Sequence, residues 1–304
     1  MLRVRRTQRQ ISVAEQLMSH YLALGIEYNG TGFCGLQTQL AQRTVQSELE
    51  DAISQVAAEQ VRIDFSSRTD SGVHATNQVI GFESDSFREN YNWRQGINAY
   101  LPDDIAVHTL VTVAPNFDVR RSSRWRRYLY VFGECDHVPA IGRNFATWGA
   151  PGLNVEAMNS QAQAFLGEHD FTSFRGANCQ SKSPRRCLHS LSVLRMGDYV
   201  IVDIIANAFL LRMVRNIAGA LLDIGRGIAL DMNSLLSYRD RSRASKTAPP
   251  MGLYLVQVCY KEYPELSRLR IPRILGSECR LHQWESDDFV NVREFIEPHE
   301  TLVE

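Results

Sequence analysis

S-S-R-T-D-S-G-V-H-A-T-N-Q, residues 66–78, separates two short runs of strand-forming residues at 61–65 and 79–83. Such runs, bounded by small polar residues, predict strands, so this stretch is expected to be a loop held between two of them. Gly72 lies near its middle, and a glycine permits a sharp turn or the close approach of a ligand. We expect the fold to be organised around this loop.

Arg68 and Asp70 lie two residues apart in the loop, so one carboxylate comes near one guanidinium in a mostly uncharged setting. One interpretation is a structural turn in which Asp70 caps a backbone amide and Arg68 is solvated, the commoner use of such a sequence. The other is a functional site, because functional side chains concentrate on loops held by a rigid scaffold. The loop alone leaves both interpretations open.

The rest of the chain predicts an α+β fold. Its 304 residues, 44% hydrophobic and 22% charged, are enough to bury a real core. Both halves contain strands that flank an amphipathic helix, which favours two ferredoxin-like α/β lobes with mainly antiparallel sheets that meet at a central cleft. The expected strands are 21–27, 61–65, 79–83, 105–112, 188–195, 199–206 and 253–260, and the expected helices are 45–56, 93–101, 154–166 and 210–221.

Four segments are expected along the chain. Residues 1–20 form a basic arm, 21–115 an N-terminal lobe with the Asp70 loop, and 116–262 a C-terminal lobe. In residues 263–304, prolines, arginines and finally acids replace the strand pattern. This last segment is therefore expected to be a tail, with a role that the sequence does not disclose.

Cysteines and hydropathy argue against several classes of protein. The six cysteines form no C-x-x-C pair, so reduced thiols in a cytoplasmic protein are expected. The spacing of Cys179, Cys187 and His189 matches no standard zinc pattern, and we expect no metal. The most apolar run, 199–214, is interrupted by charged residues, so no membrane-spanning segment is expected.

A glycine-rich turn follows the first expected strand. Gly30, Gly32 and Gly35 formally spell the fingerprint of a dinucleotide-binding site. That fingerprint requires a helix to open at its third glycine, so that the helix N-terminus faces a pyrophosphate. The helix is expected only from Val45, and a nucleotide site is therefore disfavoured.

An arginine-rich stretch favours nucleic acid as the partner. Five arginines fall within eight positions without an opposing acid, and aromatic residues are interleaved with them. A solvated surface strand is the ordinary interpretation, but mutual repulsion makes such a cluster costly unless an anion lies across it. Arginine also grips phosphate and stacks on bases in ways that lysine does not. The stretch contains Arg120, Arg121, Arg124, Trp125, Arg126, Arg127, Tyr128 and Tyr130.

Two further features bear on the same question. Residues 169–186 form a second polar stretch, basic and rich in hydroxyl groups, which could contact sugar and phosphate or could be a plain surface loop. The apolar helix expected at 210–221 carries Arg215 among residues expected to be buried. A buried guanidinium requires a partner, and Asp70 is a candidate.

Five motifs, in their order and approximate spacing, resemble those of the tRNA pseudouridine synthase A (TruA) family. The resemblance covers residues 21–260, and it departs from the usual family residues at Leu36, at Ser71 and at the pair Leu211-Arg212. The motifs are S-R-T-D-S-G-V-H-A, R-R-Y-L-Y, D-F-T-S-F-R, F-L-L-R-M-V-R-N-I-A-G and A-P-P-M-G-L-Y-L-V-Q-V-C-Y.

This resemblance implies roles for individual residues. Asp70 would be the catalytic carboxylate, and Arg215 would pair with it. Tyr128 would pack against the target uracil, while Arg68 would lie beside the displaced base and help to hold it out of the stack. The residues implied to contact RNA are Arg120, Arg121, Asn178, Gln180 and Lys182.

The implied activity is the isomerisation of uridine to pseudouridine at positions 38–40 of the tRNA anticodon stem-loop, by a homodimer that needs no cofactor. One carboxylate suffices, and it could add to C6 of the uracil or act at C1′; the sequence does not choose. Two other hypotheses compete. Asp70 could merely order a loop in an RNA-binding module, or the protein could be a glycoside hydrolase, which would need a second carboxylate.

Overall fold

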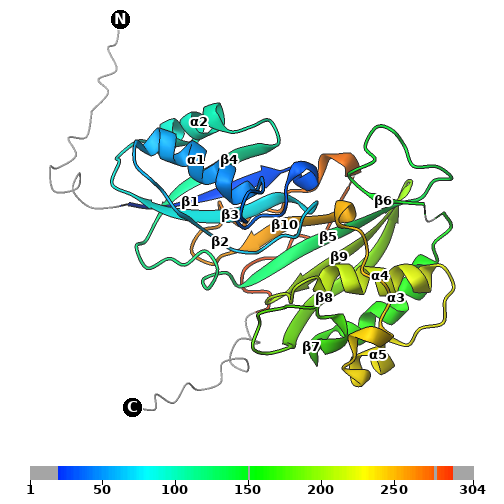
Figure 1. The fold of residues 1–304 in the computed structure, drawn as a ribbon. Coiled ribbons are helices and arrows are strands. Elements are labelled where there is room, and N and C mark those ends of the chain that lie inside the picture. Colours follow the sequence, from blue (N-terminus) through cyan, green and yellow to red (C-terminus); the bar gives the residue numbers. More distant parts are fainter. Residues whose placement is uncertain (1–19, 150, 277–278, 290–304) are drawn as a thin grey trace, which may run out of the picture.

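Ten strands form one continuous sheet in the computed structural model, which describes residues 20–149, 151–276 and 279–289 (Figure 1). The main order is β4-β1-β3-β10-β5-β9-β8-β7, with β2 paired to β3 and β6 paired to β5. Pairing is antiparallel except between β3 and β10 and between β5 and β6. The strands are β1 (His20–Tyr28), β2 (Ile63–Phe65), β3 (His74–Ser84), β4 (Ile105–Val113), β5 (Trp125–Gly133), β6 (Thr147–Trp148), β7 (Gly167–Asp170), β8 (Arg185–Met196), β9 (Tyr199–Ala206) and β10 (Leu253–Cys259), and the α-helices are α1 (Val45–Ala57), α2 (Asn90–Tyr100), α3 (Val155–Ala162), α4 (Met213–Gly225) and α5 (Met232–Tyr238).

The two halves of the sheet meet at a short parallel seam between β3 and β10. The seam pairs Tyr254 with His74 and Leu255 with Ala75, and the rings of His74 and Tyr254 stack with their centroids 4.8 Å apart. Figure 1 shows α1 and α2 beside the half that holds β1 and β4, and α3, α4 and α5 beside the half that holds β8 and β9. The predicted α+β class is confirmed. Because the Asp70 loop runs directly into β3 at His74, it lies at this seam.

Local sequence explains the helices. α1 begins with a capping box, in which Thr44 Oγ1 accepts from the N–H of Ser47 and Ser47 Oγ accepts from the N–H of Thr44. α4 is buried along most of its length, as expected for a helix that is apolar on nearly every face. The expected elements are present with displaced ends, most of all at the start of β3. The lobe boundary after residue 115 stays a prediction, since the sheet is continuous, and the basic arm lies almost wholly outside the described residues.

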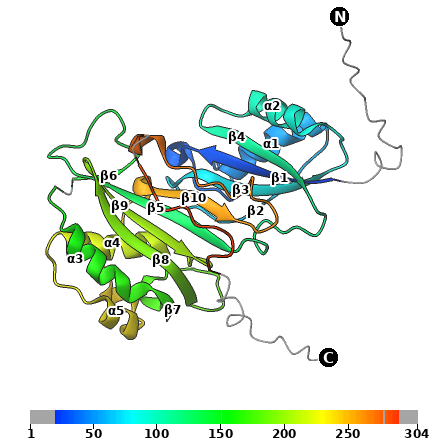
Figure 2. The ribbon, with the colours of Figure 1, turned by 180° about the vertical axis from the view of Figure 1, so that it is seen from behind.

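The described part of the expected tail packs across the central strands (Figure 2). Leu266, Leu275 and Cys279 are almost fully buried there. Nη1 of Arg127, on β5, donates to the carbonyl oxygen of His282 at 2.8 Å. This segment therefore completes the hydrophobic core on one face of the sheet, a role that its irregular sequence pattern did not indicate.

Two of the five clustered arginines point into the protein, which corrects the expectation that an anion lies across all of them. The side chain of Arg127 is fully buried, and its Nε and Nη2 bond the two carboxylate oxygens of Asp203 on β9 at 2.8 and 2.6 Å. Arg126 is only 6% exposed and donates to backbone carbonyl oxygens. Successive side chains of a strand face opposite sides, so these neighbours find separate internal partners.

The glycine-rich turn provides close packing for the Asp70 loop. A Cβ atom at Gly30 would lie 2.0 Å from the carbonyl oxygen of Val73, so only glycine allows this approach. α1 begins at Val45, after the turn, and no helix opens at the third glycine, in agreement with the sequence argument. Gly72 has a φ of +78°, the left-handed conformation that the turn after Asp70 requires.

Replacing Arg127 with methionine is expected to lower the free energy of unfolding by about 3–5 kcal/mol, because the buried carboxylate of Asp203 would lose its partner. The control is Arg121→Met, since the Arg121 side chain is 89% exposed; it should change the same free energy by less than about 0.5 kcal/mol. Urea unfolding measures both differences. Equal stability of the two variants would show that the buried pair does not hold β5 to β9.

Candidate active site

Hydrogen bonds to β3 and β5 fix the start of the Asp70 loop. The N–H of Ser66 donates to the carbonyl oxygen of Val79 at 2.9 Å. The side-chain amide of Gln78 accepts from Ser66 Oγ at 2.6 Å and donates to the carbonyl oxygen of Ser67 at 2.6 Å. From β5, Nη2 of Arg126 donates to the carbonyl oxygen of Ser66 at 2.9 Å. The loop is therefore bound to the strand that follows it and to the central strand of the other half.

The glycine-rich turn fixes the middle of the loop. The hydroxyl groups of Tyr28 and Thr69 are 2.8 Å apart, and the N–H of Leu36 donates to the carbonyl oxygen of Thr69 at 3.1 Å. Ser71 Oγ donates to the carbonyl oxygen of Phe33 at 3.1 Å. Leu36 and Ser71, two residues at which the resemblance is imperfect, thus support the loop from behind.

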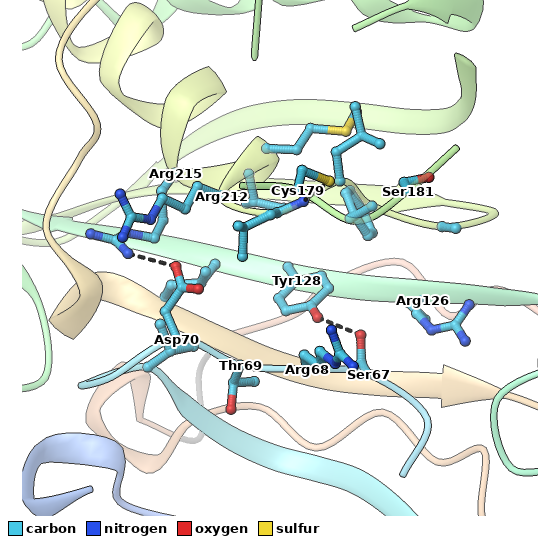
Figure 3. A pocket seen from close by; sticks show the side chains of 18 of the residues that line it. Ser67, Arg68, Thr69, Asp70, Arg126, Tyr128, Cys179, Ser181, Arg212 and Arg215 are labelled. Carbon is cyan, nitrogen blue, oxygen red and sulfur yellow. Dashed lines mark hydrogen bonds and ion pairs between the residues drawn. The ribbon is translucent and has the colours of Figure 1, made fainter. Parts of the chain in front are cut away.

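Asp70 forms an ion pair with Arg215 of α4, as the sequence predicted. Arg215 Nη1 lies 2.6 Å from Asp70 Oδ2, and the side chains of Arg215 and Asp70 are 12% and 22% exposed. The Nε of the same guanidinium donates to the carbonyl oxygen of Ala248 at 2.8 Å. These two bonds fix the guanidinium, so the carboxylate is held in one orientation (Figure 3).

Tyr128, on β5, lies between Asp70 and Arg126 (Figure 3). Its hydroxyl group is 2.9 Å from Ser67 Oγ, and its ring meets that of Phe209 edge to face with the centroids 5.0 Å apart. Burial raises the pKa of the Tyr128 phenol, which therefore stays neutral near pH 7. The side chain offers a flat apolar surface and one hydrogen-bonding group to a bound ring.

These side chains line a pocket of about 510 Å³. Asp70 is the only acid among the described residues that line it, whereas six are arginines. A concave site with such an excess of positive charge suits a polyanionic ligand. The arginines are Arg68, Arg120, Arg126, Arg186, Arg212 and Arg215.

The structure brings most of the expected RNA contacts to this pocket. Nη1 of Arg68 donates to Oε1 of Gln180 at 2.8 Å, which bridges the Asp70 loop and the second polar stretch. Arg121 and Lys182 are exposed and do not line the pocket. Of the expected contacts, those that line it are Arg68, Arg120, Asn178 and Gln180.

Three pocket residues escaped the sequence analysis as site residues. Ser67 holds the hydroxyl group of Tyr128, Arg126 holds the loop, and Arg186 lines the wall formed by the second polar stretch. Alternation along β5 could have identified Arg126, because it shares a face with Tyr128. For Ser67 and Arg186 no local pattern gives a signal, since tertiary packing alone brings them to the pocket.

The described residues contain no group of His, Cys, Asp or Glu side chains that could hold a metal ion. Cys187 Sγ lies 3.9 Å from His189 Nδ1, while Cys179 belongs to the pocket wall. The six cysteines are free thiols. Within the described part of the chain, no helix is long and apolar enough to cross a membrane.

Comparison with known proteins places this pocket in a family. A family model described as tRNA pseudouridine synthase matches residues 25–120 and 161–261. The tRNA pseudouridine synthase A of Shewanella sediminis is 46% identical over 252 residues, which cover 82% of this chain and 97% of that protein. Proteins of the same name from Shewanella sp. (strain MR-4) and Shewanella amazonensis are 48% identical over the same shares of both chains.

One solved structure, described as a Cbf5-Nop10-Gar1 complex, overlaps 77% of this chain and 49% of its own with a TM-score of 0.33 and 9% identity, a likeness too weak to inform the site. The family match spans both halves of the sheet and includes Asp70, Tyr128 only by its neighbouring strands, and Arg215. Together with the curated relatives, it shows that this chain belongs to the tRNA pseudouridine synthase family.

Proposed function

We propose that this protein isomerises uridine to pseudouridine at positions 38–40 of the tRNA anticodon stem-loop, with Asp70 as the catalytic carboxylate. Family membership and the names of the relatives support pseudouridylation of tRNA. One observation carries the assignment of the site: a lone carboxylate, paired with a nearly buried guanidinium, lies in an arginine-lined pocket of about 510 Å³.

The reaction breaks the C1′–N1 bond and forms a C1′–C5 bond, so every atom of the base is kept and no outside reductant is required. One carboxylate can assist by adding to C6 of the uracil or by acting at C1′. Arg215 holds Oδ2 of Asp70, and among the described residues Oδ1 makes no hydrogen bond. Oδ1 is therefore the oxygen that would meet the substrate.

The base must leave its stack before Asp70 can reach it, because a stacked base shields its reacting atoms. Unstacking costs a few kcal/mol, which contacts to the displaced base must offset. The ring of Tyr128 provides a flat surface beside Asp70, and Arg68 lies exposed at the rim, where its guanidinium could fill the vacated position. Arg68 would exchange its bond to Gln180 for contacts with RNA.

Partners and cofactors follow from the same chemistry. The pocket is lined on both walls by groups that suit phosphate and sugar, so tRNA is the proposed partner. The proposed assembly is a homodimer, which rests on the family resemblance alone. No step of the isomerisation calls for a cofactor.

The other two hypotheses make different demands on the pocket. A glycoside hydrolase requires two carboxylates that flank one bond, and Asp70 is the only acid among the described residues that line the pocket. A pure RNA-binding module would not need the carboxylate. Its ion pair with Arg215, made from a loop fixed at both ends, is better explained by a reacting group than by a turn.

Replacing Asp70 with asparagine is expected to reduce pseudouridine formation by at least about 10³-fold, because the amide cannot act as a nucleophile. Binding of an anticodon stem-loop should remain, since the arginines are untouched. Chemical mapping of the transcript measures the modification, and filter binding measures the affinity. Wild-type turnover by the asparagine variant would assign Asp70 to a structural turn, and absence of product from the wild-type protein would refute the isomerase proposal.

Arg120→Ala is expected to lower the slope of log K against log salt concentration by about 0.7–0.9, the loss of one phosphate contact. Arg62→Ala is the matched control, because Arg62 is 73% exposed and pairs with Glu50 near α1, outside the pocket. Titration of the stem-loop at several salt concentrations gives both slopes. If both variants keep the wild-type slope, Arg120 does not contact phosphate.

A further inference from the structure

The pocket has two chemically distinct ends. Figure 3 shows Asp70 and Arg215 on one side of Tyr128, and Arg126 and Ser181 on the other. The second side, which we call the arginine end, is formed by Arg120, Arg126, Arg186 and Ser181. Asp70, the only acid among the described lining residues, belongs to the opposite end. The arginine end therefore holds three cations without a carboxylate from the pocket wall.

Arg126 shapes this end. Its guanidinium donates to the carbonyl oxygens of Ser66, Arg120 and Asn207 at 2.9 to 3.2 Å. These bonds tie the Asp70 loop and the turn that carries Arg120 to the end of β9. Arg126 thus fixes the position from which Arg120 can act.

Arg186 is the half-buried cation of this end. Its Nη2 donates to Ser181 Oγ at 2.7 Å, and its Nη1 donates to the carbonyl oxygens of Ser183 and Arg185 at 3.1 and 2.5 Å. All three acceptors are neutral. Its Nε is buried and has no hydrogen-bond partner among the described residues. The guanidinium is therefore oriented by its neighbours, but those bonds supply no opposing charge.

The surroundings of Arg186 make an anion favourable. Burial lowers the pKa of Arg186, and the charges of Arg175, Arg126 and Arg120 lower it further, while only the thiol of Cys179 acts in the opposite direction. Like charges gathered at a half-buried position are costly when no anion lies among them. Buried polar atoms without a partner are rare in folded proteins, and each one marks a site that is incomplete.

Geometry identifies the kind of anion. Arg126 and Tyr128 lie two residues apart on one face of β5, a rise of about 6.6 Å. A base held at Tyr128 would therefore place a phosphate of the same nucleotide within reach of the arginine end. Guanidinium groups bind phosphate oxygens with two parallel hydrogen bonds, a pattern that a diester can accept.

We propose that Arg186, with Arg120, binds the phosphodiester that flanks the target nucleotide, in an anion subsite distinct from the Asp70–Arg215 pair. This inference rests on the proposed function, because it takes the ligand of the pocket to be RNA. The subsite positions the nucleotide along the pocket, so that the base reaches Asp70 while its backbone stays at the arginine end.

The test replaces single phosphates of an anticodon stem-loop with uncharged methylphosphonates on either side of the target uridine. The wild-type protein should lose about tenfold in affinity at one of these positions, the usual scale for one charge-assisted hydrogen-bonded contact. Arg186→Gln should bind the unmodified RNA about tenfold more weakly and should not respond to that methylphosphonate. Arg186→Lys should keep part of the response, since it retains the charge.

Arg185→Gln is the matched control. Arg185 is the adjacent arginine, but its side chain is 57% exposed, pairs with Glu168 at 3.2 Å and does not line the pocket. Its removal should leave the wild-type response to each methylphosphonate. Urea unfolding of Arg186→Gln shows whether the variant is folded, and the wild-type scan needs no variant at all.

Two results would overturn the subsite. One is a wild-type protein that binds both methylphosphonate RNAs as tightly as the unmodified RNA. The other is a folded Arg186→Gln variant that responds to them as the wild type does. Product formation is scored separately on the unmodified RNA. Phosphate coupling without pseudouridine would refute the proposed reaction alone, and pseudouridine without coupling would refute the subsite alone.

Discussion

The contact between Asp70 and Arg215 is the interaction on which the site depends. It joins a loop at the edge of β3 to a helix that follows β9, across 145 residues of sequence. The loop belongs to one half of the sheet and the helix to the other, so the pair forms only when the seam between β3 and β10 brings both halves together. Assembly of the fold and assembly of the site are therefore one event.

Rigidity of the Asp70 loop is the second constraint. Gln78, Tyr28 and Arg126 approach the loop from β3, β1 and β5 and bond it at its start and middle. A carboxylate on such a loop has little freedom to turn away from its partner. The arginines divide the work: Arg127 neutralises Asp203 inside the core, Arg126 holds backbone carbonyls, and the remaining pocket arginines face the space that a ligand would fill.

Local sequence was sufficient for some of these features. Apolar periodicity and a capping residue predicted α1, and a charge among apolar neighbours predicted that Arg215 would seek a carboxylate. Other features depend on contacts that no local pattern contains. Asp203 meets Arg127 from 76 residues away, so the arginine run looked unopposed. The segment that contains Leu266 covers the sheet without regular periodicity, and Arg186 reaches the pocket only through the course of its loop.

The most direct test of the central claim is the rate of tritium release from C5 of the target uridine in a single turnover, since that hydrogen leaves when C5 bonds to C1′. If Asp70 and Arg215 act as one unit, Asp70→Asn, Arg215→Met and the double variant should lose rate by similar factors, because removal of either partner disables both. Losses that multiply in the double variant, or an Arg215→Met protein that keeps the wild-type rate, would contradict the account.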